Sequence, residues 1–432
     1  INSGTAELRG IIIGTNGIIK TGAGNIVLSD NGNSYDGDTV VSGGILTLAS
    51  DAFTGDTYIV ENGATLRSAV DARNSQILRL NAGGTLTAAA GQTFEQAGKL
   101  EIPEIGGTVT IGSTTDTGII DLTLPGGAEV GDNAKLEIAG GTLRVSTLVA
   151  RFVPAGLKQT TINSGASFDI GFSDAYINGL LGSGTVTTTD TDDKILKLSG
   201  LSSFSGVIED GDGMITVENV GTNAVMQLYG ANTYSGGTNI SDGALFLGSD
   251  SAAGSGTITT NNAIVGYGNG VTTNNPIVIE SGTLELQAGG GRFATQAGVI
   301  SEAGGARALE KTGAGSIELS AENTYTGMTT VTGGTLNITG SVDSTAVVVG
   351  AGAQLQVDGA SLLDTSALTL NGTGNLTLTG SETIGSVTGT GAGTVSLGNN
   401  TLTTGGTNSS TGFSGIISGS GGLTNQGTGP VT

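Results

Sequence analysis

Two short acidic segments hold the residues best suited to chemistry in this sequence. Asp190, Asp192 and Asp193 lie together in the Thr-rich stretch TTTDTDDK, and Asp210 and Asp212 alternate with glycine in DGDG. Clustered carboxylates can supply oxygen ligands to Ca²⁺ or act as acids and bases in hydrolysis. The second segment lacks the remaining EF-hand positions and a downstream bidentate glutamate. The interpretation we favour is a solvated polar loop for the first segment and an acidic turn for the second.

Histidine and cysteine are both absent from the chain. A Ser-His-Asp triad is therefore impossible, and a zinc site would have to consist of carboxylates alone. Disulfides, thiolate metal sites and cysteine nucleophiles are excluded as well. The glycine cluster at residues 289–291 lacks the strand–loop–helix context and the GK[ST] motif of a phosphate loop. We predict no catalytic, cofactor-binding or metal-binding residues, no cofactor, and a protein that is not an enzyme.

Three corners share the pattern Asn-Thr/Ser-Tyr and end at Tyr35, Tyr234 and Tyr325. Tyrosines at repeated corners could present an aromatic face and a hydroxyl to glycans. The structural alternative is a corner in which the asparagine caps backbone groups and the tyrosine covers the edge of a rung. We favour the structural alternative.

The composition is that of a thin, repetitive core and an acidic surface. The chain has 432 residues, of which 79 are glycine, 12% are charged and 4% are aromatic, and its net charge is −22. A strongly negative surface argues against nucleic-acid binding and disfavours anionic membranes. No apolar run approaches the roughly 18 residues of a transmembrane helix. We therefore predict no nucleic-acid partner and no membrane insertion by this segment.

The chain is built from internal repeats, with units near residues 18–49, 217–249 and 309–339 and a partial unit at 415–432. Each unit alternates apolar and polar residues between glycine corners, which is typical of half-buried strands. Looser corners of the form G-x-T-L recur about every 20 residues, a length that suits one rung of three short strands. The pattern predicts an all-β parallel β-helix of roughly 20 rungs, about 90–100 Å long.

We predict a single elongated body over residues 1–432, with few or no helices. Two segments, 65–80 and 149–160, carry more Arg and Lys than their surroundings. We expect both to be loop excursions or short helices that leave the β-helix.

The unit at 309–336 resembles the passenger-associated repeat of bacterial autotransporters, also called the autotransporter-associated β-strand repeat. Near residues 19–46 the match is good, with Ser34 in place of Thr. Near 217–245 it is partial, because Asn219 and Asn223 replace the lysine and the second glycine. In the best unit the family pattern is met by Leu309, Lys311, Gly313, Gly315, Ile317, Leu319, Asn323, Thr324, Tyr325, Gly327, Thr329, Val331, Gly334 and Leu336.

This resemblance implies a right-handed parallel β-helix that is exported across the outer membrane and is secreted or displayed on the bacterial cell surface. In that family the repeat is linked to secretion and folding of the passenger, and not to chemistry. Since no translocator barrel follows and the last repeat is incomplete, we expect the chain to be part of a longer precursor or a mature piece cut from one.

The leading functional hypothesis is an extracellular structural or adhesive protein that forms a surface stalk or fibre. The alternatives are a polysaccharide-degrading β-helix enzyme and a toxin-like secreted passenger. The predicted partners are a glycan or protein on a host or neighbouring cell, and a second copy of the chain. An uncapped β-helix end exposes unpaired backbone groups, so copies could stack head to tail. The competing explanation is that the ends result from excision.

Overall fold

The structure, a computed structural model, describes residues 3–51, 53–103, 106–125, 127–146, 157–408 and 411–429. Every regular element in these ranges is a β-strand, and the strands wind as a parallel β-solenoid of about 19 turns. The predicted all-β parallel fold is therefore confirmed. No helix within these ranges is long and apolar enough to cross a membrane.

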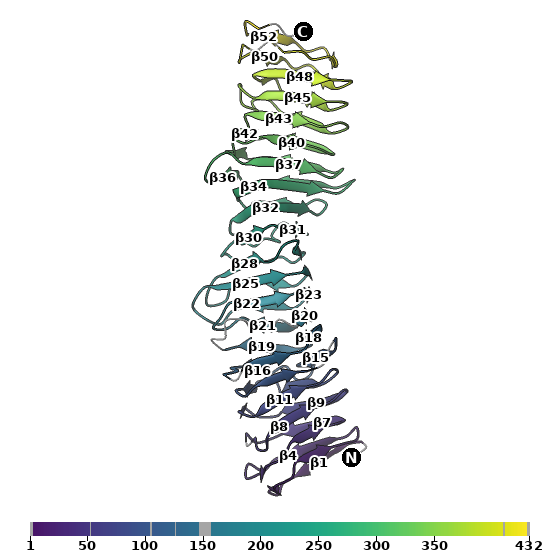
Figure 1. Ribbon diagram of the computed structural model, residues 1–432, viewed down its shortest axis with the longest axis vertical. Helices are drawn as coiled ribbons and strands as arrows, with labels where there is room; N and C mark the ends of the chain where they lie inside the picture. The colour runs from purple at the N-terminus through teal and green to yellow at the C-terminus, as the bar shows by residue number, and fades with distance from the viewer. Residues whose placement is uncertain are drawn as a thin grey trace. The chain divides into compact units, whose positions relative to one another are not determined.

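The chain divides into two compact units. The first comprises Ile1–Glu218 and Asn232–Gly236, and the second comprises Asn219–Ala231 and Gly237–Thr432. Within each unit, the strands of one long sheet lie one above another in chain order, as the strand labels show (Figure 1). A single body over residues 1–432 stays a prediction.

In the first unit the strands form one long sheet, two shorter sheets and a two-stranded pair. The long sheet contains β1 (Thr5–Leu8), β4 (Asn25–Leu28), β7 (Gly44–Leu48), β9 (Ala64–Ser68), β12 (Thr85–Ala88), β15 (Thr108–Ile111), β18 (Ala134–Ile138), β20 (Leu157–Ile162), β22 (Ala175–Asn178), β23 (Leu180–Gly182), β25 (Lys194–Ser199), β26 (Leu201–Phe204) and β28 (Ile215–Asn219), whose last residue is the first of the second unit. The second sheet contains β3 (Ile18–Lys20), β6 (Thr39–Val41), β8 (Thr57–Val60), β11 (Ile77–Leu80), β14 (Leu100–Ile102) and β17 (Ala128–Val130). The third contains β10 (Ala72–Asn74), β13 (Thr93–Gln96), β16 (Ile119–Leu122), β19 (Gly141–Val145), β21 (Ala166–Asp169), β24 (Thr185–Thr187) and β27 (Val207–Ile208), and the pair is β2 (Ile13–Gly14) with β5 (Ser34–Tyr35).

The second unit has the same plan. Its long sheet contains β29 (Val225–Leu228), β30 (Thr238–Ser241), β31 (Ala244–Leu247), β32 (Ile258–Tyr267), β34 (Ile277–Ala288), β36 (Ile300–Glu302), β37 (Ala308–Thr312), β40 (Thr329–Val331), β43 (Ala346–Val349), β45 (Ala367–Asn371) and β48 (Ser386–Thr390). A second sheet contains β33 (Thr272–Thr273), β35 (Phe293–Gln296), β38 (Ser316–Leu319), β41 (Thr335–Ile338), β44 (Gln354–Val357), β46 (Asn375–Leu378), β49 (Thr394–Ser396) and β51 (Ile416–Ser418). Two small sheets contain β39 (Glu322–Asn323) with β42 (Ser341–Val342), and β47 (Glu382–Thr383), β50 (Leu402–Thr404) and β52 (Leu423–Asn425).

Inward side chains form columns along the stacking direction. In the first unit Leu46 pairs with Leu66, Leu66 with Leu86, and Leu86 with Ile111, and all four are buried. Because side chains alternate between the two faces of a strand, every second residue enters the core. Burial of one such Leu or Ile side chain contributes roughly 1.5–3 kcal/mol.

The second unit stacks its core in the same way. Ile317 pairs with Leu336, then Leu355, Leu376 and Val395 follow on successive strands, and all five are buried. The period-2 pattern in the sequence therefore identifies both the strands and the face of each strand that is buried.

Residues 65–80, expected to be an excursion, instead form regular rungs, and that prediction is wrong. The segment contains most of β9 and all of β10 and β11, each paired in parallel with a strand about one turn away. Its three arginines lie on outward positions, and each pairs with a carboxylate: Arg67 with Asp116 at 2.9 Å, Arg73 with Glu95 at 2.9 Å and Arg79 with Glu101 at 2.7 Å. The high charge therefore marks the solvent face of strands and not a loop.

The second expected excursion, 149–160, lies mostly outside the described residues. Its last four positions belong to β20, which pairs with β18.

Candidate functional site

The lysine of the repeat motif points into the core. Lys311 lies on β37 between Leu286 and Val331 of the neighbouring strands, and it is fully buried. Its Nζ donates hydrogen bonds to three carbonyl oxygens: Thr312 at 2.7 Å, Gly313 at 3.0 Å and Gly333 at 3.0 Å. Thr312 ends β37 and Gly313 begins the corner that follows it, whereas Gly333 belongs to the corner of the next rung. One ammonium group therefore binds two successive corners together.

The first repeat contains the same arrangement. Lys20 is buried, and its Nζ donates to the carbonyl oxygens of Gly22 at 2.7 Å and Gly43 at 2.6 Å. Burial lowers the pKa of Lys311 to about 8 and lowers the pKa of Lys20 too, because removal from water disfavours the charged ammonium. The carbonyl dipoles offset part of this cost by accepting charge-assisted hydrogen bonds.

The glycine pair of the motif makes this corner possible. Gly334 adopts φ +61°, and a Cβ atom there would lie 2.1 Å from the carbonyl oxygen of Gly315. Gly44 occupies the equivalent position in the first repeat, with φ +65° and the carbonyl oxygen of Gly24 2.4 Å from an added Cβ. Only glycine combines this backbone conformation with such a close approach of the neighbouring rung.

The motif asparagine caps the backbone of the neighbouring rungs. Asn323 accepts the amide N–H of Ile300 at 2.8 Å through Oδ1, and its Nδ2 donates to the carbonyl oxygens of Ala321 and Ser341, each at 2.9 Å. It thus satisfies backbone groups on three successive rungs. The asparagines of the other two corners, Asn33 and Asn232, likewise accept an amide N–H from the preceding rung, each at 2.8 Å. The capping interpretation from the sequence is confirmed.

The corner tyrosines are buried and do not face solvent. Tyr35 is 2% exposed, and Tyr234 and Tyr325 are fully buried. The hydroxyl of Tyr35 lies 2.6 Å from Oγ1 of Thr39, and the hydroxyl of Tyr325 lies 2.8 Å from Oγ1 of Thr329. The glycan-contact alternative is therefore wrong for these residues, because a ligand could not reach the rings without opening the core.

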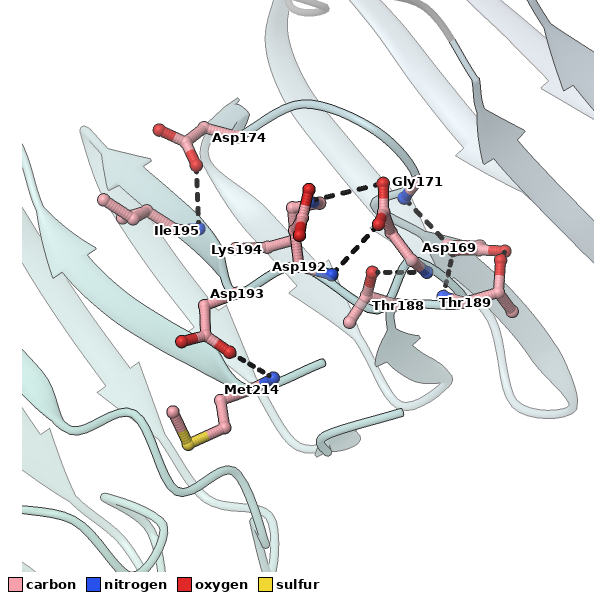
Figure 2. A network of polar contacts seen from close by, with 11 residues as sticks. Asp169, Gly171, Asp174, Thr188, Thr189, Asp192, Asp193, Lys194, Ile195 and Met214 are labelled. Atoms are coloured by element: carbon pink, nitrogen blue, oxygen red, sulfur yellow. Dashed lines mark hydrogen bonds and ion pairs between the residues drawn. The ribbon is translucent and has the colours of Figure 1, made fainter. Parts of the chain in front are cut away.

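The acidic cluster around Asp190 braces a corner of the first unit. Asp190 accepts the amide N–H of Asp192 at 3.0 Å and lies 3.4 Å from Nζ of Lys194, whose side chain is 5% exposed. These two groups hold the pKa of Asp190 below its usual range. Asp193 points elsewhere and accepts the amide N–H of Met214 at 3.1 Å, as Figure 2 shows. The structure brings the three carboxyl-bearing residues onto one corner but directs Asp190 and Asp193 to different backbone amides.

Asp169, which the sequence did not point to, lies at the same corner (Figure 2). Its carboxylate is 1% exposed and accepts the amide N–H groups of Gly171 and Thr189 at 3.1 and 3.0 Å, and the Thr189 hydroxyl at 2.7 Å. Nε of Arg144 on β19 completes the set at 2.8 Å. Four donors therefore hold a buried carboxylate that closes β21 onto the next rung.

Asp210 of the DGDG segment has a similar role. Its Oδ1 accepts the amide N–H of Ile215 at 2.7 Å, and its Oδ2 accepts the amide and hydroxyl of Ser235 at 3.0 and 2.6 Å. This geometry is that of an acidic turn. The other acidic residue of the segment, Asp212, lies at an exposed position. Across the part of the chain that the structure describes, no group of three acidic side chains is arranged to hold a metal ion.

The corners thus define a repetitive, internally braced parallel β-solenoid, and the comparisons with known proteins identify its class. The family model described as Passenger-associated-transport-repeat matches residues 18–48, 225–245 and 309–338, within the three complete units predicted from the sequence. The predicted partial unit at 415–432 stays a prediction.

Two relatives extend the likeness over most of the chain. The Adhesin BmaC autotransporter of Brucella suis biovar 1 (strain 1330) is 32% identical over 400 residues, which cover 83% of this chain and 11% of the relative. The Probable autotransporter YfaL of Escherichia coli (strain K12) is 27% identical over 380 residues, which cover 75% of this chain and 30% of the relative. The chain thus spans less than a third of either relative. No solved structure matches the chain significantly.

These matches support an autotransporter passenger with passenger-associated transport repeats. Proteins of this class are exported, which places the chain at the bacterial cell surface or in the extracellular space.

Proposed function

We propose that this chain is an adhesive, non-enzymatic segment of its passenger, in which the solenoid presents an outer surface to other cells. The likeness to an adhesin over 83% of this chain is the observation that carries the proposal. The geometry of the repeats supports it, because the motif lysines, asparagines and tyrosines are used inside the solenoid. The outward side chains between the corners would then make the contacts with a partner.

The polysaccharide-degrading alternative has less support. Such an enzyme needs carboxylates that converge on one substrate position. Asp190, Asp193 and Asp210 of the two candidate segments instead accept backbone amides. A toxin-like passenger would require a specific effect on host cells, and no observation on these residues favours that function.

Adhesion can be tested with purified chain coupled to fluorescent beads. Beads would be applied under flow to cultured epithelial cells, to surfaces coated with extracellular-matrix proteins and to a bacterial lawn. We expect retention above that of beads carrying heat-unfolded chain on at least one surface. Retention no higher than the unfolded control on every surface would overturn the adhesive function, and release of reducing ends from a glycan panel would overturn the non-enzymatic assignment.

End-to-end self-association stays a prediction. Sedimentation velocity of the chain at increasing concentration tests it, because head-to-tail contacts generate an open series of oligomers. Growth of that series would support it, and a single monomeric boundary at all concentrations would refute it.

A further inference from the structure

The second unit contains a cleft of about 920 Å³ that no motif in the sequence indicated. It lies over the corners before β29 and β31, the middle of β32 and β34, and one outward residue of β37. Its volume is in the range of ligand sites in proteins. All of its lining residues belong to the second unit.

An outward column of side chains runs the length of the cleft. Val225 pairs with Ala244, Ala244 with Ile264, Ile264 with Glu285, and Glu285 with Glu310. All five are half-buried on the outer face of their strands. The cleft therefore crosses five strands and extends about 19 Å at a strand spacing of about 4.8 Å. Three apolar side chains are followed by two stacked carboxylates.

A polar wall flanks this column. Asn223, Asp242 and Asn262 occupy equivalent corners with φ values of +63°, +51° and +50°. One backbone hydrogen bond connects the first two: the amide of Asn223 donates to the carbonyl oxygen of Asp242 at 3.1 Å. Asn and Asp tolerate this left-handed conformation, so the corners carry polar side chains where glycine would leave none. The wall contributes a third carboxylate, that of Asp242.

A buried hydrogen-bond acceptor lies directly behind the cleft. Asn219 is 1% exposed and occupies the motif position that Lys311 holds in the best repeat. Its Nδ2 donates to the carbonyl oxygen of Ala224 at 2.9 Å, but its Oδ1 has no hydrogen-bond partner among the described residues. The amide lies against Gly243, where an added Cβ would be 2.9 Å from Oδ1, and Gly243 lines the cleft. An unsatisfied buried acceptor is unusual in native structures and calls for a partner, such as a water molecule.

The same outer face already binds one cationic side chain. Phe246 lies two residues after Ala244 on β31, and the guanidinium of Arg292 lies 5.4 Å from the centre of its ring. Tyr229 lies 6.0 Å from Phe246, and its ring covers Gly248, where a Cβ would be 2.3 Å from it. An aromatic surface next to a column of carboxylates favours the binding of Arg and Lys side chains.

We propose that this cleft binds an extended, basic peptide segment of a partner protein. Aliphatic parts of the peptide would lie on Val225, Ala244 and Ile264, and Lys or Arg side chains further along it would reach the carboxylates of Glu285 and Glu310. About six extended residues span 19 Å. Such a segment runs across the strands, so it is held by side chains and not by added strand pairing.

The negative charge of the cleft favours a basic peptide over a glycan. The cleft lining contains three carboxylates besides Asn, Thr and apolar groups, with neither Lys nor Arg, and the chain as a whole has a net charge of −22. Acidic polysaccharides would be repelled, whereas a basic segment would be attracted over a distance before contact. This inference rests on the proposed adhesive function and names the class of partner for it.

The test measures binding of fluorescein-labelled octalysine to the purified full chain by fluorescence anisotropy at about 0.15 M salt. The double variant E285Q/E310Q keeps the shape of the side chains and removes two charges, and we expect it to weaken binding about tenfold. A244F fills the cleft without changing the charge, and a similar loss is expected. Thermal unfolding of each variant checks that it is folded.

The matched control is E318Q/E322Q, which removes two charges from other sheets of the same unit. Glu318, like Glu285, accepts threonine hydroxyls, from Thr295 and Thr339. We expect octalysine affinity to change less than twofold in this control. An equal loss in the control, or no loss in E285Q/E310Q, would overturn the cleft as the site. Displacement of octalysine by neutral cellohexaose, but not by unlabelled peptide, would assign the cleft to a glycan instead.

The bead assay separates this inference from the adhesive function. Beads that adhere equally well with wild-type chain and with E285Q/E310Q would refute the cleft as the adhesive contact and leave adhesion intact. Octalysine binding that depends on the cleft, without adhesion to any surface, would refute the adhesive function and leave the cleft intact.

Discussion

Nζ of Lys311 lies 3.0 Å from the carbonyl oxygen of Gly333, which is 22 positions further along the chain. Lys20 makes the equivalent bond to Gly43 at 2.6 Å. In both repeats the ammonium also binds the corner of its own rung. The lysine of the motif therefore has a structural role: it satisfies carbonyl groups that two glycine corners leave inside the solenoid.

Replacing Lys311 with methionine should destabilise the second unit. The substitution keeps a flexible apolar stem but leaves the carbonyl oxygens of Thr312, Gly313 and Gly333 without their donor. A buried unsatisfied acceptor costs roughly 1–3 kcal/mol. The urea midpoint of unfolding should fall accordingly, while K135M, at an exposed position on β18, should change it little. A K311M midpoint equal to that of wild type would refute this role.

The stability that depends on Lys311 should change with pH in a defined direction. Its pKa is about 8 in the folded protein and about 10.4 in an unfolded chain. Between these values the unfolded state binds more protons, so the free energy of unfolding rises with pH. From pH 8 to pH 10 wild type should therefore gain stability relative to K311M, with no such change between pH 6 and pH 7.5. Urea unfolding of both proteins across this range measures the difference, and a difference that falls with pH would contradict the assignment.

Gly334→Ala should lower the stability of the second unit more than Gly352→Ala does. Both glycines have positive φ, +61° and +77°, so both substitutions introduce backbone strain of roughly 1–2 kcal/mol. Only at Gly334 would the new methyl group also meet a carbonyl oxygen at 2.1 Å, whereas no atom lies within 4 Å at Gly352. Thermal unfolding of the two variants isolates the effect of close rung packing. Equal losses would show that the corner tolerates a side chain.

Much of the fold follows from the sequence because its signals are local. Alternation of apolar and polar residues identifies buried positions such as Leu336 and Leu355, and glycine spacing identifies the corners. Parallel stacking then follows from the repetition itself, since each rung covers the next with the same face.

The roles of charged residues could not be predicted from the sequence, because they depend on partners about one turn away. Lys311 occupies an inward position although lysine normally faces solvent, and only the stacked corner supplies its acceptors. The charge of Arg67 and Arg79 led to the prediction of a loop, but both residues lie on regular strands and pair with carboxylates. The cleft depends on the register between Glu285 and Glu310, which are 25 residues apart in sequence but adjacent in the sheet.

Asp169→Asn should destabilise the first unit. The asparagine side chain would retain one acceptor oxygen but would lose the charge that Arg144 pairs with, and it would direct an NH₂ group at one of the donors. Hydrogen bonds to a charged group contribute roughly 1.5–3 kcal/mol each, so a loss of about 2–3 kcal/mol is expected. D132N, at an exposed position, is the control. Urea unfolding that is unchanged in D169N would show that the corner is held by other contacts.

Bead adhesion of two variants tests the central claim most directly, namely that the repeat corners brace the solenoid and the outer face makes the adhesive contacts. Y325F removes a buried hydroxyl, whereas E285Q/E310Q changes only outward side chains. At a temperature at which both variants are folded, Y325F beads should be retained as well as wild type, and E285Q/E310Q beads should lose most of their retention. Loss of adhesion in Y325F with full retention in E285Q/E310Q would contradict the account, because it would place the contact at the corner.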